Sequence, residues 1–230
     1  SILEDKPGRI WLGTGKGLSR MWQGQFKTFT SADGLGHGSV YALESDRQGR
    51  IWIGTSSGLS VYSSGRFRNF TTKHGLPDRV VISLMADSRG GVWVGTVGGM
   101  CRWNGRSFDL PSFPSSGSAV HCFLESRDGY FWFCDARGVS RVASPLDKAK
   151  PAVKRYSIGE GPLYSFVTSL YQDSKDRIWM TSRQGLSCLE NDTFSHYTTA
   201  DGLSDNACYF ILEDNIGNLW IGTGRGVCRY

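Results

Sequence analysis

The 230-residue sequence has no long hydrophobic run, no block of like charge and no visible signal peptide. No apolar segment approaches the roughly 18 residues that a membrane-spanning helix needs. The net charge of +5 comes from Lys and Arg residues scattered along the chain, which does not indicate a nucleic-acid-binding patch. We therefore expect no nucleic-acid partner. Any attachment to a membrane would depend on segments outside this sequence.

The six cysteines form neither CxxC pairs nor a cluster. Metal sites and disulfide frameworks typically show such grouping. Most of these cysteines lie in apolar segments with the pattern of strands, so we expect buried thiols that pack as small hydrophobic side chains. We predict no metal site and no cofactor. The cysteines are Cys101, Cys122, Cys134, Cys188, Cys208 and Cys228.

Glycine and aromatic residues are abundant, with 30 glycines, eight tryptophans and an aromatic content of 13% against only seven prolines. This composition favours many short strands joined by tight turns. No segment shows a strong helical period. Apolar residues at 39% and charged residues at 20% are typical of a folded protein.

One phrase containing tryptophan recurs at intervals of roughly 40 residues. Each tryptophan has an apolar residue on both sides, which indicates a strand that is covered on both faces. A glycine follows six residues later and predicts a turn with positive φ. An aspartate stands six residues before the tryptophan in five copies, and Ser126 takes its place in the fourth. The tryptophans are Trp11, Trp52, Trp93, Trp132, Trp179 and Trp220.

Each complete unit is predicted to contain four strands, here named a to d. In the second unit they cover 40–43, 50–55, 59–62 and 66–71. Four antiparallel strands in about 40 residues are typical of a propeller blade. A parallel β-helix is the alternative, but its repeats are usually shorter. We therefore predict an all-β protein, a β-propeller of four-stranded antiparallel blades.

Six blades are represented in a single propeller spanning 1–230, and the last lacks its outer strand. This gives about 23 strands. The chain begins with Ser rather than Met, and no pairing of terminal strands that would close a ring is evident. We expect a piece of a larger propeller or receptor. The approximate blade limits are 1–30, 39–71, 80–110, 119–157, 166–198 and 207–230.

The segments "GRIWLGTGKGL", "GRIWIGTSSGL", "GGVWVGTVGGM" and "GNLWIGTGRGV" lie at 8–18, 49–59, 90–100 and 217–227. The triplet "DGL" follows at 33–35 and 201–203, with "HGL" at 74–76. Together these motifs resemble the two-component regulator propeller repeat. The fourth unit departs most, because "YFWFCDARGV" lacks Gly-Thr, and the fifth contains "IWMTSRQGL".

The resemblance implies a seven-bladed propeller, often paired with a second one, in the periplasmic or extracytoplasmic sensor region of a signal-transduction receptor. Such regions are typically linked through a membrane helix to a histidine kinase, and many are similar to receptors for oligosaccharides. Six cysteines are mildly at odds with an oxidising compartment.

A candidate ligand site is predicted on one set of loops. In this strand order, the b–c turns and the d–a connections emerge on the same face. Varied side chains on a repeated scaffold can form one asymmetric site. Arg and Asn side chains suit hydroxyls or carboxylates, and a tyrosine can stack on a sugar ring. The candidates are Lys16, His37, His74, Arg79, Asp135, Arg137, Tyr164, Arg183, Gln184, Asn206 and Arg225.

Other chemistries receive little support from the sequence. "GTGKGLS" at 13–19 lacks the spacing of a phosphate-binding loop and leads into a strand, so a hairpin turn is the better interpretation. The repeated aspartates lack the further acidic positions of a calcium loop, and we expect them to cap turns.

Three functions remain open. The first is a non-catalytic sensor that binds an oligosaccharide or another small ligand. The second is a protein-interaction scaffold that contacts a second propeller or a copy of itself. The third, a propeller lyase, would use His37 or His74, and no acidic partner stands at a fixed spacing from either.

Overall fold

The computed structural model describes residues 1–113, 117–143, 145–146, 151–156 and 166–230. This part of the chain contains 23 strands and three short 3-10 helices. The strands form six antiparallel sheets, five with four strands and the last with three. The predicted propeller blades are therefore confirmed. Among the described residues, no helix is long and apolar enough to cross a membrane.

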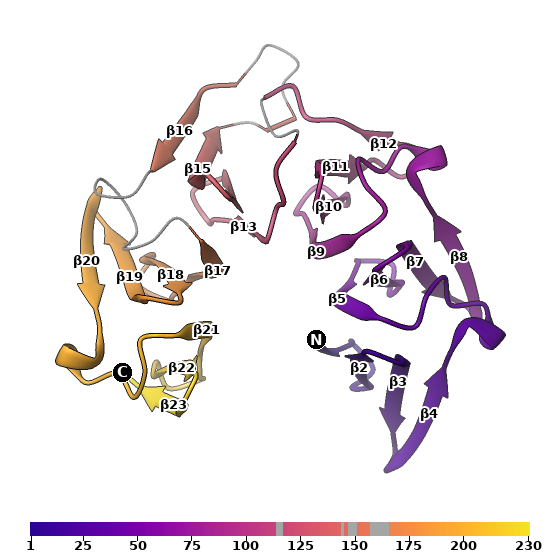
Figure 1. Ribbon diagram of the computed structural model, residues 1–230, viewed down its shortest axis with the longest axis horizontal. Coiled ribbons are helices and arrows are strands. Elements are labelled where there is room, and N and C mark those ends of the chain that lie inside the picture. Colours follow the sequence, from indigo (N-terminus) through magenta and orange to yellow (C-terminus); the bar gives the residue numbers. More distant parts are fainter. Residues whose placement is uncertain (114–116, 144, 147–150, 157–165) are drawn as a thin grey trace. The chain divides into compact units, whose positions relative to one another are not determined.

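The chain divides into two compact units, Ser1–Val120 and His121–Tyr230. The first unit contains blades one to three, and Figure 1 shows β5 to β8 in order within one sheet. Its strands are β1 (Ile2–Glu4), β2 (Ile10–Thr14), β3 (Gly17–Trp22), β4 (Gln25–Phe29), β5 (Val40–Ser45), β6 (Ile51–Thr55), β7 (Gly58–Ser63), β8 (Arg66–Phe70), β9 (Val81–Ala86), β10 (Val92–Thr96), β11 (Gly99–Trp103) and β12 (Phe108–Asp109).

The second unit contains blades four to six, coloured from rose to yellow in Figure 1. Its strands are β13 (Cys122–Glu125), β14 (Tyr130–Asp135), β15 (Gly138–Ala143), β16 (Val153–Tyr156), β17 (Val167–Gln172), β18 (Ile178–Ser182), β19 (Gly185–Glu190), β20 (Thr193–Tyr197), β21 (Cys208–Glu213), β22 (Leu219–Thr223) and β23 (Gly226–Arg229).

Strand b of blades two to five is covered on both faces, as predicted, whereas that of blades one and six is partly exposed. In blade two, Ile51, Trp52 and Ile53 are each exposed by 1% or less. The glycine after them permits close packing of the next blade, because a Cβ at Gly54 would lie 2.8 Å from Val81 Cγ1. The Gly-Thr pair of the repeat therefore marks the place where neighbouring blades approach most closely.

The repeated aspartate caps the a–b turn and also holds the tryptophan. In blade two, Asp46 Oδ1 accepts hydrogen bonds from the amides of Gln48 (2.9 Å) and Arg50 (3.0 Å). Its Oδ2 accepts bonds from Arg50 Nε at 2.5 Å and from Trp52 Nε1 at 2.7 Å. The predicted turn cap is confirmed, and the bond to the indole explains the fixed spacing of six residues. The same aspartate–indole bond is made by Asp5, Asp173 and Asp214.

The "DGL" and "HGL" triplets end short 3-10 helices after strand d. In the first of these helices, Ser31–Asp33, the Thr30 side chain and Asp33 form a capping box, and Gly34 follows with a φ of 98°. Only glycine adopts this left-handed conformation readily. The same arrangement recurs at Thr72–His74 and at Thr199–Asp201.

Candidate functional site

In the first unit, the predicted site residues lie at the expected turns. Lys16 is exposed in the β2–β3 turn, and Arg79 is exposed in the connection to β9. The d–a connections contact the b–c turns, as predicted, because Ser39 Oγ donates to Gly15 O at 3.3 Å. His37 lies in the same connection with its Nδ1 2.7 Å from Ser56 Oγ.

His74 has a different role from His37, although both were predicted in equivalent connections. Its Nδ1 accepts a hydrogen bond from the Thr71 amide at 3.0 Å. It thereby occupies the capping position that Asp33 holds in blade one. Because Nδ1 accepts this hydrogen bond within the turn, His74 has a local structural role.

In the second unit, Asp135 and Arg137 lie together. Asp135 stands where blade two has Thr55, and its side chain is 1% exposed. Its carboxylate accepts hydrogen bonds from Arg137 Nη2 at 2.7 Å and from Arg155 Nη1 at 3.0 Å. Arg155 was not predicted, because its approach to Asp135 depends on the pairing of β15 with β16.

The remaining predicted residues are distributed over separate turns. Arg183 and Gln184 are exposed in the β18–β19 turn. Asn206 Oδ1 accepts a hydrogen bond from the Thr199 amide at 2.7 Å, and Arg225 pairs with Asp205 at 3.4 Å. Tyr164 lies outside the described residues. Ligand binding by this loop face therefore stays a prediction.

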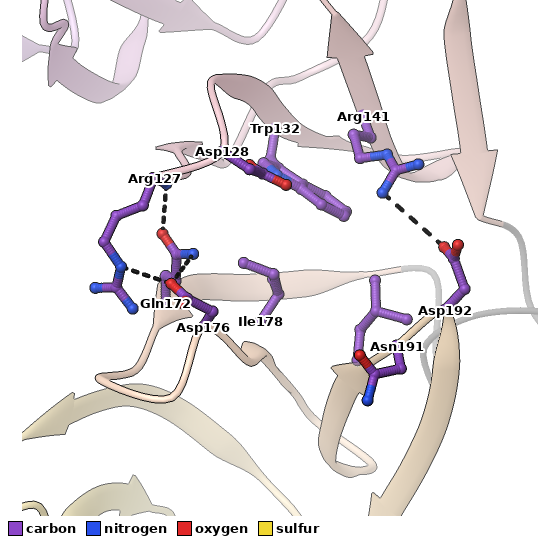
Figure 2. A pocket seen from close by; sticks show the side chains of 10 residues that line it. Arg127, Asp128, Trp132, Arg141, Gln172, Asp176, Ile178, Asn191 and Asp192 are labelled. Carbon is purple, nitrogen blue, oxygen red and sulfur yellow. Dashed lines mark hydrogen bonds and ion pairs between the residues drawn. The ribbon is translucent and has the colours of Figure 1, made fainter.

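A pocket of about 530 Å³ lies elsewhere, among the a–b turns of blades four and five and the c–d turn of blade five. Figure 2 shows that Arg127, Gln172 and Asp176 gather at one end, and Arg141 and Asp192 at the other. The pocket is lined by Arg127, Asp128, Trp132, Arg141, Gln172, Asp176, Ile178, Leu189, Asn191 and Asp192.

The pocket exists because blade five lacks an aromatic residue that three other blades carry on strand c or directly after it. In blades two and three, Tyr62 and Trp103 pack on the tryptophan of the preceding blade, with centroid distances of 5.3 Å and 6.0 Å. In blade six, Tyr230 packs on Trp179 at 5.5 Å. Blade five has Leu189 at this position, which leaves space beside Trp132.

One end of the pocket is a network between two a–b turns. The Arg127 amide donates to Gln172 Oε1 at 2.7 Å. Asp176 Oδ1 accepts hydrogen bonds from Arg127 Nε at 2.7 Å and Gln172 Nε2 at 3.1 Å (Figure 2). Asp176 replaces the glycine of the other copies and has a φ of 64°. These contacts fix the rim of the pocket across the blade boundary.

The other end is formed by Arg141 and the β19–β20 turn. The Arg141 guanidinium lies over the rings of Tyr130 and Trp132, with centroid distances of 4.4 Å and 5.6 Å. Its Nη1 is 3.9 Å from Asp192 Oδ1. Its Nε is buried and has no hydrogen-bond acceptor in the part of the chain that the structure describes. Arg141 therefore keeps donor capacity for a ligand.

Asp192, at the rim of this pocket, is ionised at neutral pH. A hydrogen bond from Lys154 Nζ to Asp192 lowers the pKa of that carboxyl below its usual value. Asp192 and Asp176 thus present acceptors beside the donors of Arg141, Gln172 and Asn191. The floor is apolar, because Ile178 and Leu189 are buried there. Such a mixture can hold a ligand that offers both hydroxyl donors and acceptors.

The sequence contains a signal for this pocket that the loop-face prediction did not use. When the units are aligned on tryptophan, Leu189 replaces an aromatic residue and Asp176 replaces glycine in the same copy. Two departures that face one blade boundary indicate a local opening. Their convergence with Arg127 and Arg141 of blade four depends on packing between blades, which single-sequence patterns do not show.

A model of the family described as "Two component regulator propeller" matches residues 34–57, 75–98 and 202–225. No curated protein matches the chain significantly. Among solved structures, the extracellular domain of a hybrid two component system from B. thetaiotaomicron is similar over 100% of this chain and 39% of its own length, with 20% identity and a TM-score of 0.73.

Two further structures share the fold. PorZ, a surface component of the type-IX secretion system of Porphyromonas gingivalis, is 19% identical over 100% of this chain and 38% of its own, with a TM-score of 0.80. A virginiamycin B lyase from Staphylococcus aureus is 15% identical over 99% of this chain and 78% of its own, with a TM-score of 0.75. The chain thus spans about two fifths of the first two. As the motifs predicted, three segments of this chain match the two component regulator propeller family.

Proposed function

We propose that this chain is a non-catalytic, ligand-binding propeller from the extracytoplasmic sensor region of a signal-transduction receptor. The family repeat and the similarity to an extracellular two component system domain support this proposal. The observation that carries ligand binding is the pocket between blades four and five, which opens where Leu189 replaces the aromatic residue of the repeat.

The ligand we propose is an oligosaccharide that places one sugar residue in this pocket. A sugar ring has hydroxyls that both donate and accept hydrogen bonds, and its C–H face packs on apolar or aromatic surface. Arg141, Gln172 and Asn191 supply donors, Asp176 and Asp192 supply acceptors, and the floor is apolar. A volume of about 530 Å³ lies within the range of small-molecule sites.

Calorimetric titration with a panel of neutral and acidic oligosaccharides tests the proposal. We expect saturable binding that Arg141→Gln weakens and that Arg137→Gln leaves unchanged, because Arg137 lies among the b–c turns. Loss of binding in Arg137→Gln with retention in Arg141→Gln would move the site to the loop face. Absence of saturable binding across the panel would refute the oligosaccharide proposal.

A further inference from the structure

A second pocket, of about 240 Å³, lies in the first unit among residues of blades two and three. Its floor belongs to the hydrophobic core that contains Trp52, Val61, Phe70 and Trp103. Its rim carries arginine side chains. The lining residues are Arg50, Trp52, Val61, Ser63, Arg66, Phe67, Arg68, Phe70 and Trp103.

The charge of this pocket has one sign, because its lining contains three arginines and no carboxylate. Arg50 is neutralised by Asp46, whose Oδ2 lies 2.5 Å from Arg50 Nε. Arg66 and Arg68 form no ion pair with any residue that the structure describes. Two guanidinium groups therefore remain uncompensated at the rim.

The cations on the outer strand of blade four, unlike Arg66 and Arg68, are paired with carboxylates. On β16, Lys154 pairs with Asp192 at 3.1 Å and Arg155 pairs with Asp135 at 3.0 Å. Charges on outer strands also discourage pairing between sheet edges, but that role does not require unpaired arginines beside a pocket. Because the cations of β16 are paired and those of β8 are not, the arginines of β8 are available to bind an anion.

Arg66, Arg68 and Phe70 share one face of β8, because alternate residues of a strand point the same way. The Arg68 guanidinium lies 4.7 Å from the centroid of the Phe70 ring. The aromatic surface thus holds the guanidinium over the pocket floor while its N–H groups stay available. A cation beside an apolar floor favours an anion that carries a hydrocarbon part.

Trp103 supplies a second and independent observation. Its side chain lines the pocket, is 5% exposed, and its buried Nε1 has no acceptor among the described residues. The ring is fixed by Trp52, Phe70 and Phe108, with centroid distances of 6.0 Å, 5.2 Å and 4.9 Å. The dipole of this unpaired N–H lies beside the pocket and favours an anionic ligand over a neutral one.

We propose that this pocket binds a small organic carboxylate. Its carboxylate group accepts hydrogen bonds from the guanidinium of Arg68 or Arg66 and lies in the field of the Trp103 indole N–H. Its hydrocarbon part packs on Phe70 and Val61. Guanidinium groups match the planar geometry of a carboxylate. The apolar floor disfavours a strongly hydrated inorganic anion, which would lose its water there. This site is additional to the pocket between blades four and five.

The test uses benzoate as the probe, with benzamide as its neutral analogue and sulfate as an inorganic anion. Nitrogen-15 NMR follows the indole N–H signals, and the Trp103 signal is assigned from its loss in Trp103→Phe. We expect benzoate to shift that signal saturably, while benzamide and sulfate do not. Binding of benzamide as tight as that of benzoate, or an equal response to sulfate, would overturn the proposal. Absence of a shift up to the solubility limit of benzoate would also overturn it.

Two arginine variants test the site itself. Arg68→Gln and Arg66→Gln are on an outer strand and exposed, so we expect them to fold. Their combination should weaken benzoate binding about tenfold or more, because both charge-assisted hydrogen bonds are lost. Arg79→Gln is the matched control, since it removes an exposed arginine from a different loop. Equal weakening by the control and the double variant would show that net charge alone attracts the anion, which contradicts the proposal.

Discussion

Two of the blade boundaries with pockets carry different kinds of residue at one position of strand c. At the boundary of blades two and three, Trp103 packs on Trp52 and Phe70, and the remaining pocket is about 240 Å³. At the boundary of blades four and five, Leu189 stands in that position, and the pocket is about 530 Å³. The comparison teaches that the aromatic residue fills much of the space at a blade boundary, and that the pocket is larger where Leu189 replaces it.

The a–b turns of blades four and five give a second contrast. In blade five, Asp173 Oδ2 accepts hydrogen bonds from Trp179 Nε1 (2.7 Å) and Arg177 Nε (2.6 Å). In blade four, Ser126 Oγ accepts only the bond from Trp132 Nε1, at 2.9 Å, as a neutral acceptor. Both turns line the large pocket, and the turn of blade four is held by the weaker of the two arrangements.

The largest expected effect comes from removing these acceptors. Asp173→Ala leaves the Arg177 charge, the indole N–H and two turn amides without their acceptor, so we expect a loss of about 3–5 kcal/mol in the free energy of unfolding. Ser126→Ala should cost about 1–3 kcal/mol, since it removes a neutral acceptor for the indole and the hydroxyl's own bonds to Asp128 and Tyr130 O. Urea unfolding of both variants measures the difference. Equal losses would show that the ion pair adds nothing to the turn.

Exchanging the residues at the two boundaries should have the next largest effect. Trp103→Leu removes ring contacts at blades two and three, and we expect a loss of about 2–3 kcal/mol and a larger pocket there. Leu189→Tyr should change stability by about 1 kcal/mol or less, because the ring enters existing space.

Leu189→Tyr should also abolish any oligosaccharide binding, which calorimetry measures. Circular dichroism confirms that the variant retains its fold. Binding that survives in a folded Leu189→Tyr variant would show that the ligand lies outside the pocket.

The sequence predicted the blades well, because each strand is marked by local features. Apolar residues around Trp52 and glycine at position 58 set the limits of β6 and β7 within about one residue. Gly58 has a φ of 131°, as the turn prediction required. These features recur at the same positions in each copy, so a strand limit that is ambiguous in one copy can be read from the others.

The candidate sites were harder to predict from the sequence than the blades were. His37 and His74 were placed in equivalent positions, but His74 caps a turn. The pocket beside Leu189 requires side chains from several turns and strands of two blades to converge. That convergence depends on the packing of whole blades against each other. A list of exposed loop residues contains no information on which of them share a cavity.

Substitutions where neighbouring blades approach closely should have a smaller effect on stability, and they again compare one blade from each unit. In blade two a Cβ at Gly54 would lie 2.8 Å from Val81 Cγ1, so Gly54→Ala should cost about 1–3 kcal/mol. Blade four has Cys134 at this position, fully buried, so a Cβ is already accommodated there. We expect Cys134→Ala to cost roughly 1 kcal/mol. Thermal unfolding that ranks Cys134→Ala as the more damaging change would contradict this account.

The smallest effect concerns pH and compares the same two turns. Burial alone would raise the pKa of the Asp173 carboxyl, but hydrogen bonds from Trp179 and Arg177 outweigh it and lower that pKa. Since the pKa is lower in the folded state than in the unfolded one, this stabilisation is present above about pH 4 and is lost as the pH falls through the lowered value. The unfolding free energy of Asp173→Asn should therefore decline less steeply with acid than that of the wild type.

The change is small because Asp5 and Asp87 have pKa values shifted in the same direction and remain in the variant. Ser126→Ala removes no carboxylate, so its unfolding free energy should fall with pH at the wild-type slope. Parallel curves of unfolding free energy against pH for all three proteins would assign the acid sensitivity to groups other than Asp173.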